Sequence, residues 1–503
     1  MSKFSKNAIE PDSERDWQRG AARIILLPLI LILFCAASVN SSHGQTFAVL
    51  SNFNSDIWNP ENSLVQAPDG RLYGATGGNG IKGSYGGTLF GFSLVGDTLS
   101  TLHAFCAELG CPDGISSSGA LVQDENGIFY GSSPGGGTNS IGTIFSVTPS
   151  RKFTTLYNFG SQSGDGINPY SGLLLARDGN FYGTTYNGGT AGRGTLFRIT
   201  KEGTKSTIYN FCQLGNCADG SAPYGPLIQG ANGRLYGTTA YSTNSCCVPA
   251  GTVFEITLGG QLTTLHTFCL VQGCPDGSDP VAGVIQSNNG TLYGTTYQGG
   301  AYNQGTVFKI TPAGVITTIY SFCNCGDGAA PFGQLLQATD GDIYGTTNVG
   351  GANNYGTVFV IKAAGTVTTL HSFDTADGQY PLGGLLQATD GNLYGTTAVG
   401  GDSVCPKDAY GSCGTLFSLS LGLSPFVHPL TSFGRAGQSI FILGNNLEGS
   451  TGVTFNGVAA NFTVLSANSI RATVPSNAAT GIIQVVTARG TLNSNVPFTV
   501  ISR

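Results

Sequence analysis

Seven aspartates recur at one position of a repeating sequence pattern, which makes them the first candidates for chemistry. Gly follows the aspartate in all but the first copy. Pro stands four residues after it in six of the seven copies, and Ser117 replaces it in the other. Such carboxylates would suit a hard cation such as Ca²⁺, a basic partner or the hydroxyl groups of a sugar. The seven are Asp56, Asp113, Asp165, Asp219, Asp276, Asp327 and Asp377.

The same aspartate pattern also fits a structural role. Asp in front of Gly commonly accepts hydrogen bonds from the backbone of its own loop. One binding site does not need seven copies, so the repetition favours this turn role over ligand binding. We predict no cofactor and no bound metal, with Ca²⁺ as the alternative.

Aromatic residues in the loops are the other candidates for ligand contact. Trp58 lies beside Asp56, and it is the only tryptophan after the N-terminal segment, which makes it the preferred single contact. His103, His266 and His371 fill a slot that holds tyrosine in other repeats, so we expect them to pack in separate repeats. The loops also hold Tyr85, Tyr170, Tyr186, Tyr224, Tyr241, Tyr297, Tyr302, Tyr355 and Tyr380.

Motifs that would identify a reaction are missing from the sequence. It contains no His-Glu-x-x-His helix, and its Gly-rich strings lack the Gly-Lys-(Ser/Thr) ending and the following helix of a phosphate loop. A carboxylate pair for glycoside chemistry converges only in the fold. Asp276 with nearby Asp279 is a doubling of this kind in one of the loops. These observations favour binding over catalysis without deciding between them.

The cysteine count indicates disulfides. Twelve cysteines follow Cys35, and the paired Cys-x-x-Cys or His clusters of a zinc site are absent. Cys323 and Cys325, like Cys246 and Cys247, are spaced tightly for a bridge, so these four have other pairings open to them. The remaining local candidates are Cys106/Cys111, Cys212/Cys217, Cys269/Cys274 and Cys405/Cys413.

Repeating strands must position all of these residues. Four short motifs recur seven times each between Thr46 and Leu421, among them a Tyr-Gly that usually stands inside Leu-Tyr-Gly-Thr-Thr and a Gly-Thr-(Val/Leu/Ile)-Phe. Each repeat reads as four strands; in the fifth they are 281–286, 291–296, 305–310 and 315–322, with an Asn-Gly turn after the first. Four antiparallel strands repeated seven times predict a β-propeller.

The phase of the repeats predicts that the ring is closed. The chain after the leader begins with a lone fourth strand, 46–53, and the last repeat supplies only three strands. We therefore expect an all-β, seven-bladed propeller closed by the N-terminal strand. Its longer loops, with the aspartates and the cysteines, would share one face around the mouth of a central channel, and loops of this kind usually carry function.

The Leu-Tyr-Gly-Thr-Thr…Gly-Gly…Gly-Thr-Val-Phe pattern of residues 46–421 resembles the GloVer tandem repeat of bacterial secreted proteins. This resemblance implies export and surface display, and it implies no catalytic residue. In the last 82 residues, Gly444-Asn445-Asn446-Leu447, Val453-Thr454-Phe455-Asn456-Gly457 and Ala472-Thr473-Val474-Pro475 resemble an IPT/TIG domain. That resemblance implies a small immunoglobulin-like β-sandwich that acts as a spacer or binding module.

Composition and the N-terminus narrow the cellular setting. Five basic residues precede an apolar run over residues 24–39, which predicts a signal peptide or an N-terminal membrane anchor over residues 1–44. The net charge of −6 and the lack of a basic block argue against nucleic acid. We thus expect domains 1–44, 45–421 and 422–503 in an extracellular, cell-surface or periplasmic protein.

The function that we predict is binding of a carbohydrate or a protein through the variable loops. The membrane is a partner only if the N-terminal segment stays uncleaved. The alternative is an extracellular hydrolase or lyase that acts on polysaccharide with carboxylates at the channel mouth, since propellers host both kinds of protein.

Overall fold

The computed structural model describes residues 44–54, 57–79, 86–242, 250–287, 289–311, 313–362, 365–402 and 413–501, which all belong to one compact unit. Regular structure in these ranges is almost entirely β-strand, with one short 3₁₀ helix at Gly215–Cys217. Residues 1–43 of the predicted leader lie outside the described residues, as do Asp56, Tyr85, Cys246, Cys247 and Cys405.

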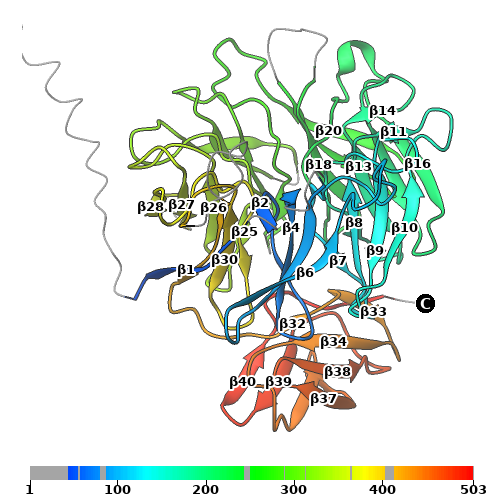
Figure 1. Cartoon of the computed structure of the whole chain (residues 1–503), viewed down its shortest axis with the longest axis vertical. Coiled ribbons are helices and arrows are strands. Elements are labelled where there is room, and N and C mark those ends of the chain that lie inside the picture. Colours follow the sequence, from blue (N-terminus) through cyan, green and yellow to red (C-terminus); the bar gives the residue numbers. More distant parts are fainter. Residues whose placement is uncertain are drawn as a thin grey trace, which may run out of the picture. The chain divides into compact units, whose positions relative to one another are not determined.

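Seven antiparallel sheets, each with a row of four strands, make up most of the described chain (Figure 1). We number them sheet 1 to sheet 7 and their strands first to fourth, in chain order. Sheets 1 to 3 are β3 (Val65–Gln66), β4 (Leu72–Asn79), β5 (Thr88–Ser93) and β6 (Thr98–Ala104); β7 (Val122–Gln123), β8 (Phe129–Ser133), β9 (Thr143–Val147) and β10 (Phe153–Asn158); and β12 (Leu174–Leu175), β13 (Phe181–Thr185), β15 (Thr195–Ile199) and β16 (Lys205–Asn210).

Sheets 4 to 7 repeat the same order. They are β17 (Ile228–Gln229), β18 (Leu235–Thr239), β19 (Thr252–Ile256) and β20 (Leu262–Thr267); β21 (Ile285–Gln286), β22 (Leu292–Thr296), β23 (Thr306–Ile310) and β24 (Ile316–Ser321); β25 (Leu336–Gln337), β26 (Ile343–Thr347), β27 (Thr357–Ile361) and β28 (Val367–Ser372); and β29 (Leu386–Gln387), β30 (Leu393–Thr397), β31 (Thr415–Ser420) and β1 (Thr46–Asn52). Three further strands, β2 (Ile57–Pro60), β11 (Gly166–Ile167) and β14 (Asn187–Gly188), pair in the loops, β2 with β4 and β11 with β14.

The two most regular motifs are explained by one packing contact. Gly294 of the Tyr-Gly motif lies opposite Phe308 of the Gly-Thr-Val-Phe motif on the neighbouring strand. A Cβ at Gly294 would lie 2.5 Å from the Phe308 ring, so only glycine leaves room for this fully buried side chain. The motif tyrosine is anchored as well: in sheet 7 the Tyr394 hydroxyl donates to Asp390 of the first turn at 2.7 Å.

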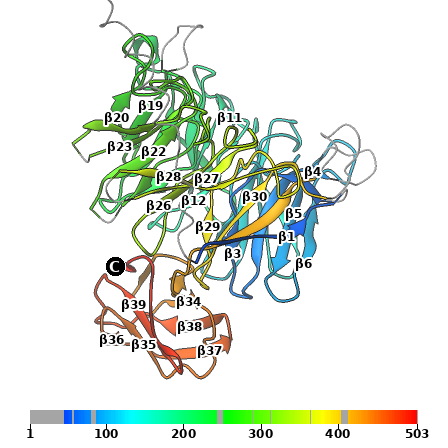
Figure 2. The ribbon, with the colours of Figure 1, turned by 90° about the vertical axis from the view of Figure 1, so that its left-hand side faces the viewer.

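Strand β1 completes sheet 7 as the sequence predicts. It pairs with β31 from Thr46↔Ser420 to Asn52↔Thr415, and Figure 2 shows the dark blue β1 beside the yellow-orange strands of that sheet. Sheet 7 also meets sheet 1, because the backbone N–H of Gly384 donates to the Ser63 hydroxyl at 2.9 Å.

The other neighbouring sheets are linked in the same manner. At least one hydrogen bond joins each consecutive pair, for example Asn62–Ser117, Ser132–Ser171, Arg177–Gln229, Thr238–Ala282, Gln334–Val284 and Thr346–Gly383. Together with the Gly384–Ser63 bond, these contacts run through all seven sheets and return to the first. The fold is thus all-β and propeller-like.

The first strand of each repeat is shorter than the sequence predicts. We expect a strand over 281–286, but the ladder of β21 contains only Ile285 and Gln286. The preceding residues pack against the neighbouring repeat instead, where a Cβ at Gly283 would lie 2.3 Å from the Pro226 carbonyl oxygen. This close approach of two backbones ends the ladder early.

The last 80 described residues form two four-stranded sheets that share one hydrophobic core. One sheet has the order β32 (His428–Pro429), β34 (Ser439–Leu443), β38 (Ser469–Thr473) and β37 (Phe462–Ser466). The other has β36 (Val458–Ala459), β35 (Gly452–Phe455), β39 (Ile483–Thr487) and β40 (Gly490–Asn493), while β33 (Phe433–Arg435) pairs in parallel with β41 (Thr499–Ile501). Ile440 and Ile470 of the first sheet pack in the same cluster as Phe455 and Val485 of the second.

Candidate functional site

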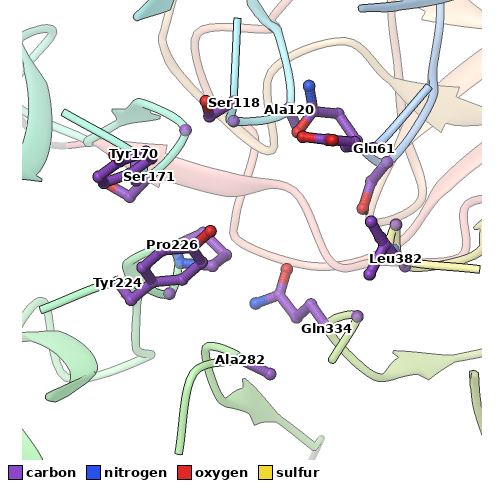
Figure 3. A pocket seen from close by; sticks show the side chains of 18 of the residues that line it. Glu61, Ser118, Ala120, Tyr170, Ser171, Tyr224, Pro226, Ala282, Gln334 and Leu382 are labelled. Atoms are coloured by element: carbon purple, nitrogen blue, oxygen red, sulfur yellow. Dashed lines mark hydrogen bonds between the residues drawn. The ribbon is translucent and has the colours of Figure 1, made fainter. Parts of the chain in front are cut away.

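A cavity of about 260 Å³ lies where the seven repeats meet. The segment before the first strand of every repeat contributes to its wall (Figure 3). The contributing residues include Glu61, Ser118, Tyr170, Tyr224, Ala282, Gln334 and Leu382, one from each of sheets 1 to 7. Small residues dominate the rest of the wall because the backbones approach closely here, as at Gly119, where a Cβ would lie 2.1 Å from the backbone nitrogen of Gly172. The cavity is therefore built by the whole set of repeats.

One side of the cavity is aromatic. The rings of Tyr170 and Tyr224 stack with centroids 5.4 Å apart and planes 21° apart. Tyr186 meets both rings edge-on, and Phe332 meets Tyr224 at 5.7 Å. Burial raises the pKa of Tyr224 to about 12, with a further contribution from the Glu61 charge, so this phenol stays protonated at neutral pH. The cluster offers flat apolar faces with hydroxyl groups at their edges.

Polar groups complete the wall on the side of sheet 1. Glu61 accepts a hydrogen bond from the Asn59 amide at 2.7 Å. Burial raises the pKa of Glu61, and the bond from Asn59 offsets part of that rise. Across the cavity, the Gln334 amide donates to the Val284 carbonyl at 3.0 Å, which fixes the position of its side chain. An acceptor and an amide thus face a stacked aromatic pair.

Asp279 lies next to this aromatic cluster. Its backbone has a left-handed conformation with φ of 58°, and its charge acts on Tyr186. Burial raises the pKa of Asp279 to about 6. Its Oδ1 atom is buried and has no hydrogen-bond partner among the described residues. The doubling of Asp276 and Asp279 in the sequence was a usable signal for this group.

The six described aspartates of the repeated set lie elsewhere, each in its own loop. Asp113 accepts hydrogen bonds from His103 at 2.8 Å and from the backbone of Cys106, and Asp327 does so from Tyr320 and Cys323. The others make equivalent contacts within their repeats: Asp165, Asp219, Asp276 and Asp377. None of the six lines the cavity, and the structure does not bring them together. Ligand binding at these residues stays a prediction.

Sequence reasoning missed the histidine–aspartate pairs. His103, His266 and His371 lie in the fourth strands of sheets 1, 4 and 6, and each bonds the aspartate of the following loop. Burial alone would raise the pKa of Asp276, but the hydrogen bonds from His266 and from the Cys269 backbone outweigh it and hold this pKa below its usual value. The tyrosines of the other sheets bond their aspartates in the same way, which is the signal that could have revealed the pairs.

Trp58 lies away from this cavity, and its predicted role as a ligand contact stays a prediction. It lies in β2 and packs against the cluster that contains Phe53 and Phe90. It is absent from the wall of the cavity, whereas Tyr170 and Tyr224, weighed only as members of a longer set, line it. Its predicted neighbour Asp56 lies outside the described residues.

Four disulfides confirm most of the expected local pairings. They join Cys106 to Cys111, Cys212 to Cys217, Cys269 to Cys274 and Cys323 to Cys325. Cys413 is also disulfide-bonded, while its candidate partner Cys405 lies outside the described residues. These bonds indicate an oxidising environment. Within the described ranges, the chain has no helix long and apolar enough to span a bilayer.

Three solved structures are similar to this chain at low sequence identity. A fungal alcohol oxidase of the AA5 family, in complex with copper, is 13% identical, with a TM-score of 0.50 over 92% of this chain and 100% of that one. The periplasmic gluconolactonase of Pseudomonas aeruginosa is 15% identical, with a TM-score of 0.41 over 70% and 97%. The oligogalacturonate lyase of Vibrio parahaemolyticus is 10% identical, with a TM-score of 0.44 over 75% and 93%. The likeness to the alcohol oxidase concerns the fold alone.

A family model decides the membership of the chain. No curated protein sequence matches this chain significantly. The model of the Gloeobacter/Verrucomicrobia repeat matches residues 38–248 and 243–465, which is most of the sequence and agrees with the repeats found over 46–421. The chain belongs to the Gloeobacter/Verrucomicrobia repeat family.

Proposed function

We propose that this protein binds a carbohydrate in the aromatic cavity at the centre of a closed, seven-bladed β-propeller. The hydrogen bonds that pass through seven consecutive sheets and return to the first support the blade count and the closure. The stacked pair Tyr170 and Tyr224 is the observation that carries the binding proposal.

The chemistry of the cavity suits a sugar ring. The C–H face of a pyranose packs on flat apolar surfaces, which the tyrosine cluster supplies. The sugar hydroxyls need donors and acceptors at fixed positions, and Glu61 and Gln334 provide them from other repeats. A protein ligand would need a larger and less concave surface than a cavity of about 260 Å³.

The remaining parts of the chain fit an exported binding protein. Residues 1–44 act as the export signal or anchor, and residues 45–421 form the propeller. Residues 422–503 form an IPT/TIG-like sandwich that spaces the propeller from its neighbours. The two sheets with one shared core support the sandwich, and the disulfides support the oxidising destination.

Binding is tested with a glycan array and titration of the best ligand against variants of the full chain. Tyr224→Ala removes a half-buried ring that lines the cavity and should weaken binding about tenfold or more, which corresponds to about 1.4 kcal/mol. Tyr302 is 62% exposed and absent from the cavity wall, so Tyr302→Ala is the matched control and should leave the affinity unchanged. Equal affinities of both variants, or no glycan bound by the folded protein, would refute the proposal.

Asp279 supports one alternative, a polysaccharide hydrolase or lyase. A carboxyl group with a pKa of about 6 can hold a proton near neutral pH and donate it to a leaving group. A reducing-sugar release assay on the glycans that bind separates the two functions. Turnover that falls at least a hundredfold in Asp279→Asn, with binding retained, would assign the enzyme. Binding without turnover would assign the lectin-like role.

A further inference from the structure

Lys205 breaks the pattern of the repeats. It is the first residue of β16, where it lies opposite Ile199 across the ladder. The position is apolar in every other sheet, so a lysine here is a specific departure from the repeat. The equivalent residues are Phe47, Leu99, Phe153, Leu262, Ile316 and Val367.

The Lys205 side chain is fully buried against Asp165. The lysine is 0% exposed and the aspartate 2%, and the Nζ atom contacts the Asp165 carboxyl group directly. The rings of Tyr157, Phe159 and Phe197 surround Nζ, with centroids 5.5 to 5.9 Å away. An ion pair in such surroundings has lost the water that solvates both charges, and mutual attraction often fails to repay this cost.

Neutral donors also converge on the Asp165 carboxyl group. The Tyr157 hydroxyl and the Gly160 N–H donate to Oδ2 at 2.7 and 2.9 Å, and the Gly166 N–H donates to Oδ1 at 2.9 Å. Donors in this arrangement draw electron density from a carboxyl carbon and stabilise the oxyanion that forms when a nucleophile adds to it. A fixed amine in contact with a polarised acid is the geometry of amide formation.

We propose that Lys205 and Asp165 condense to an intramolecular isopeptide bond. One proton passes from the ammonium group to the carboxylate, which leaves a neutral amine and a neutral acid. The amine lone pair forms the Nζ–Cγ bond. One Cγ–Oδ bond then breaks, and the oxygen leaves as water with the proton it received and the one that Nζ releases. The reaction is a condensation, so it needs no oxidant, reductant or co-reactant.

The bond would link two neighbouring repeats covalently. Asp165 lies in the loop between sheets 2 and 3, and Lys205 lies 40 residues later in the fourth strand of sheet 3. A covalent link over this distance closes a long loop in the unfolded chain and lowers its entropy. Unlike the disulfides, it would survive reduction.

The test is mass spectrometry of the full chain after reduction and complete denaturation. We expect the native protein to be lighter by the mass of one water than the Lys205→Arg variant, after correction for the substitution. Tryptic digestion should leave Lys205 uncleaved and yield a branched peptide that joins the segments of residues 165 and 205. In Lys205→Arg the chain should be cut after residue 205 and give only linear peptides.

Lys201 and Glu125 provide an internal control. They form an ion pair at 2.7 Å, but their side chains are 26% and 28% exposed, so water solvates the charges and no condensation is expected. Both segments should appear as linear peptides in the same digest. Linear peptides at Lys205 and Asp165 in the native protein would overturn the proposal, and this result needs no variant to fold.

Discussion

One position of the fourth strand holds either histidine or tyrosine, and the pair His266 and Asp276 shows why both residue types fit there. The histidine Nε2 atom bonds the aspartate at 2.8 Å, and the two side chains are 18% and 24% exposed. Tyr157, Tyr209 and Tyr320 make the same bond with a hydroxyl group in other sheets. The slot therefore requires a flat ring that ends in a hydrogen-bond donor, and it does not require a histidine.

This requirement predicts opposite results for two substitutions of His266. His266→Phe removes the donor and should lower the free energy of unfolding by about 1–2 kcal/mol at neutral pH. His266→Tyr restores a donor and should stay close to the native value. The contribution through Asp276, whose pKa is lowered from 3.8, should vanish as the pH falls below that value. Urea denaturation measures all three proteins, and equal losses in both variants would contradict the assignment.

Asp279 predicts a second pH effect, of opposite sign. Its pKa rises from 3.8 to about 6 in the folded protein, so the neutral acid is the form that the fold favours. Its favourable contribution is full below pH 3.8 and is lost as the pH rises through 6. The asparagine of Asp279→Asn cannot ionise. The stability of this variant relative to the native protein should therefore rise by about 1–3 kcal/mol as the pH is raised from 4 to 7. Denaturation curves at both pH values check this, and a constant difference would disprove it.

At the scale of elements, the segments before the first strands of the repeats approach one another closely, and this approach limits the size of the cavity. A Cβ at Gly283 would lie 2.3 Å from the backbone oxygen of Pro226, which no rotamer change can relieve. Gly283→Ala should therefore push the two segments apart and cost about 1–3 kcal/mol, with weaker ligand binding. Gly259 has no neighbouring atom closer than 3.8 Å, so Gly259→Ala should stay within about 0.5 kcal/mol. Thermal unfolding of both variants decides the point.

At the scale of the whole molecule, Phe47 tests whether the first strand closes the ring. Its ring stacks on His371 of sheet 6 at 3.7 Å, as Phe153 of sheet 2 stacks on His103 of sheet 1 at 3.9 Å. Both rings are half-buried and also meet a third-strand phenylalanine. Phe47→Ala and Phe153→Ala should then cost the same, about 2–4 kcal/mol. A loss at Phe153 alone would show that β1 is not docked in solution.

The sequence by itself determined the number and order of the strands in each repeat and the disulfides between cysteines five residues apart. These features depend on neighbours in the chain: Asn-Gly and Asp-Gly fix the turns, and cysteines five residues apart meet within one loop. The count of repeats and the lone N-terminal strand also follow from the sequence, because an incomplete last repeat can be completed only by a strand from elsewhere.

Only the tertiary structure decided which side chains line the central cavity. Tyr170, Tyr224 and Glu61 come from three repeats. They lie around one cavity because glycines let the segments before the first strands approach closely, and no local sequence pattern encodes this contact. The aspartates were conspicuous in the sequence because they repeat, but repetition reflects the needs of every loop. Lys205 and Asp279 depart from the repeat. Their predicted chemistry depends on their burial, which is a property of the folded chain.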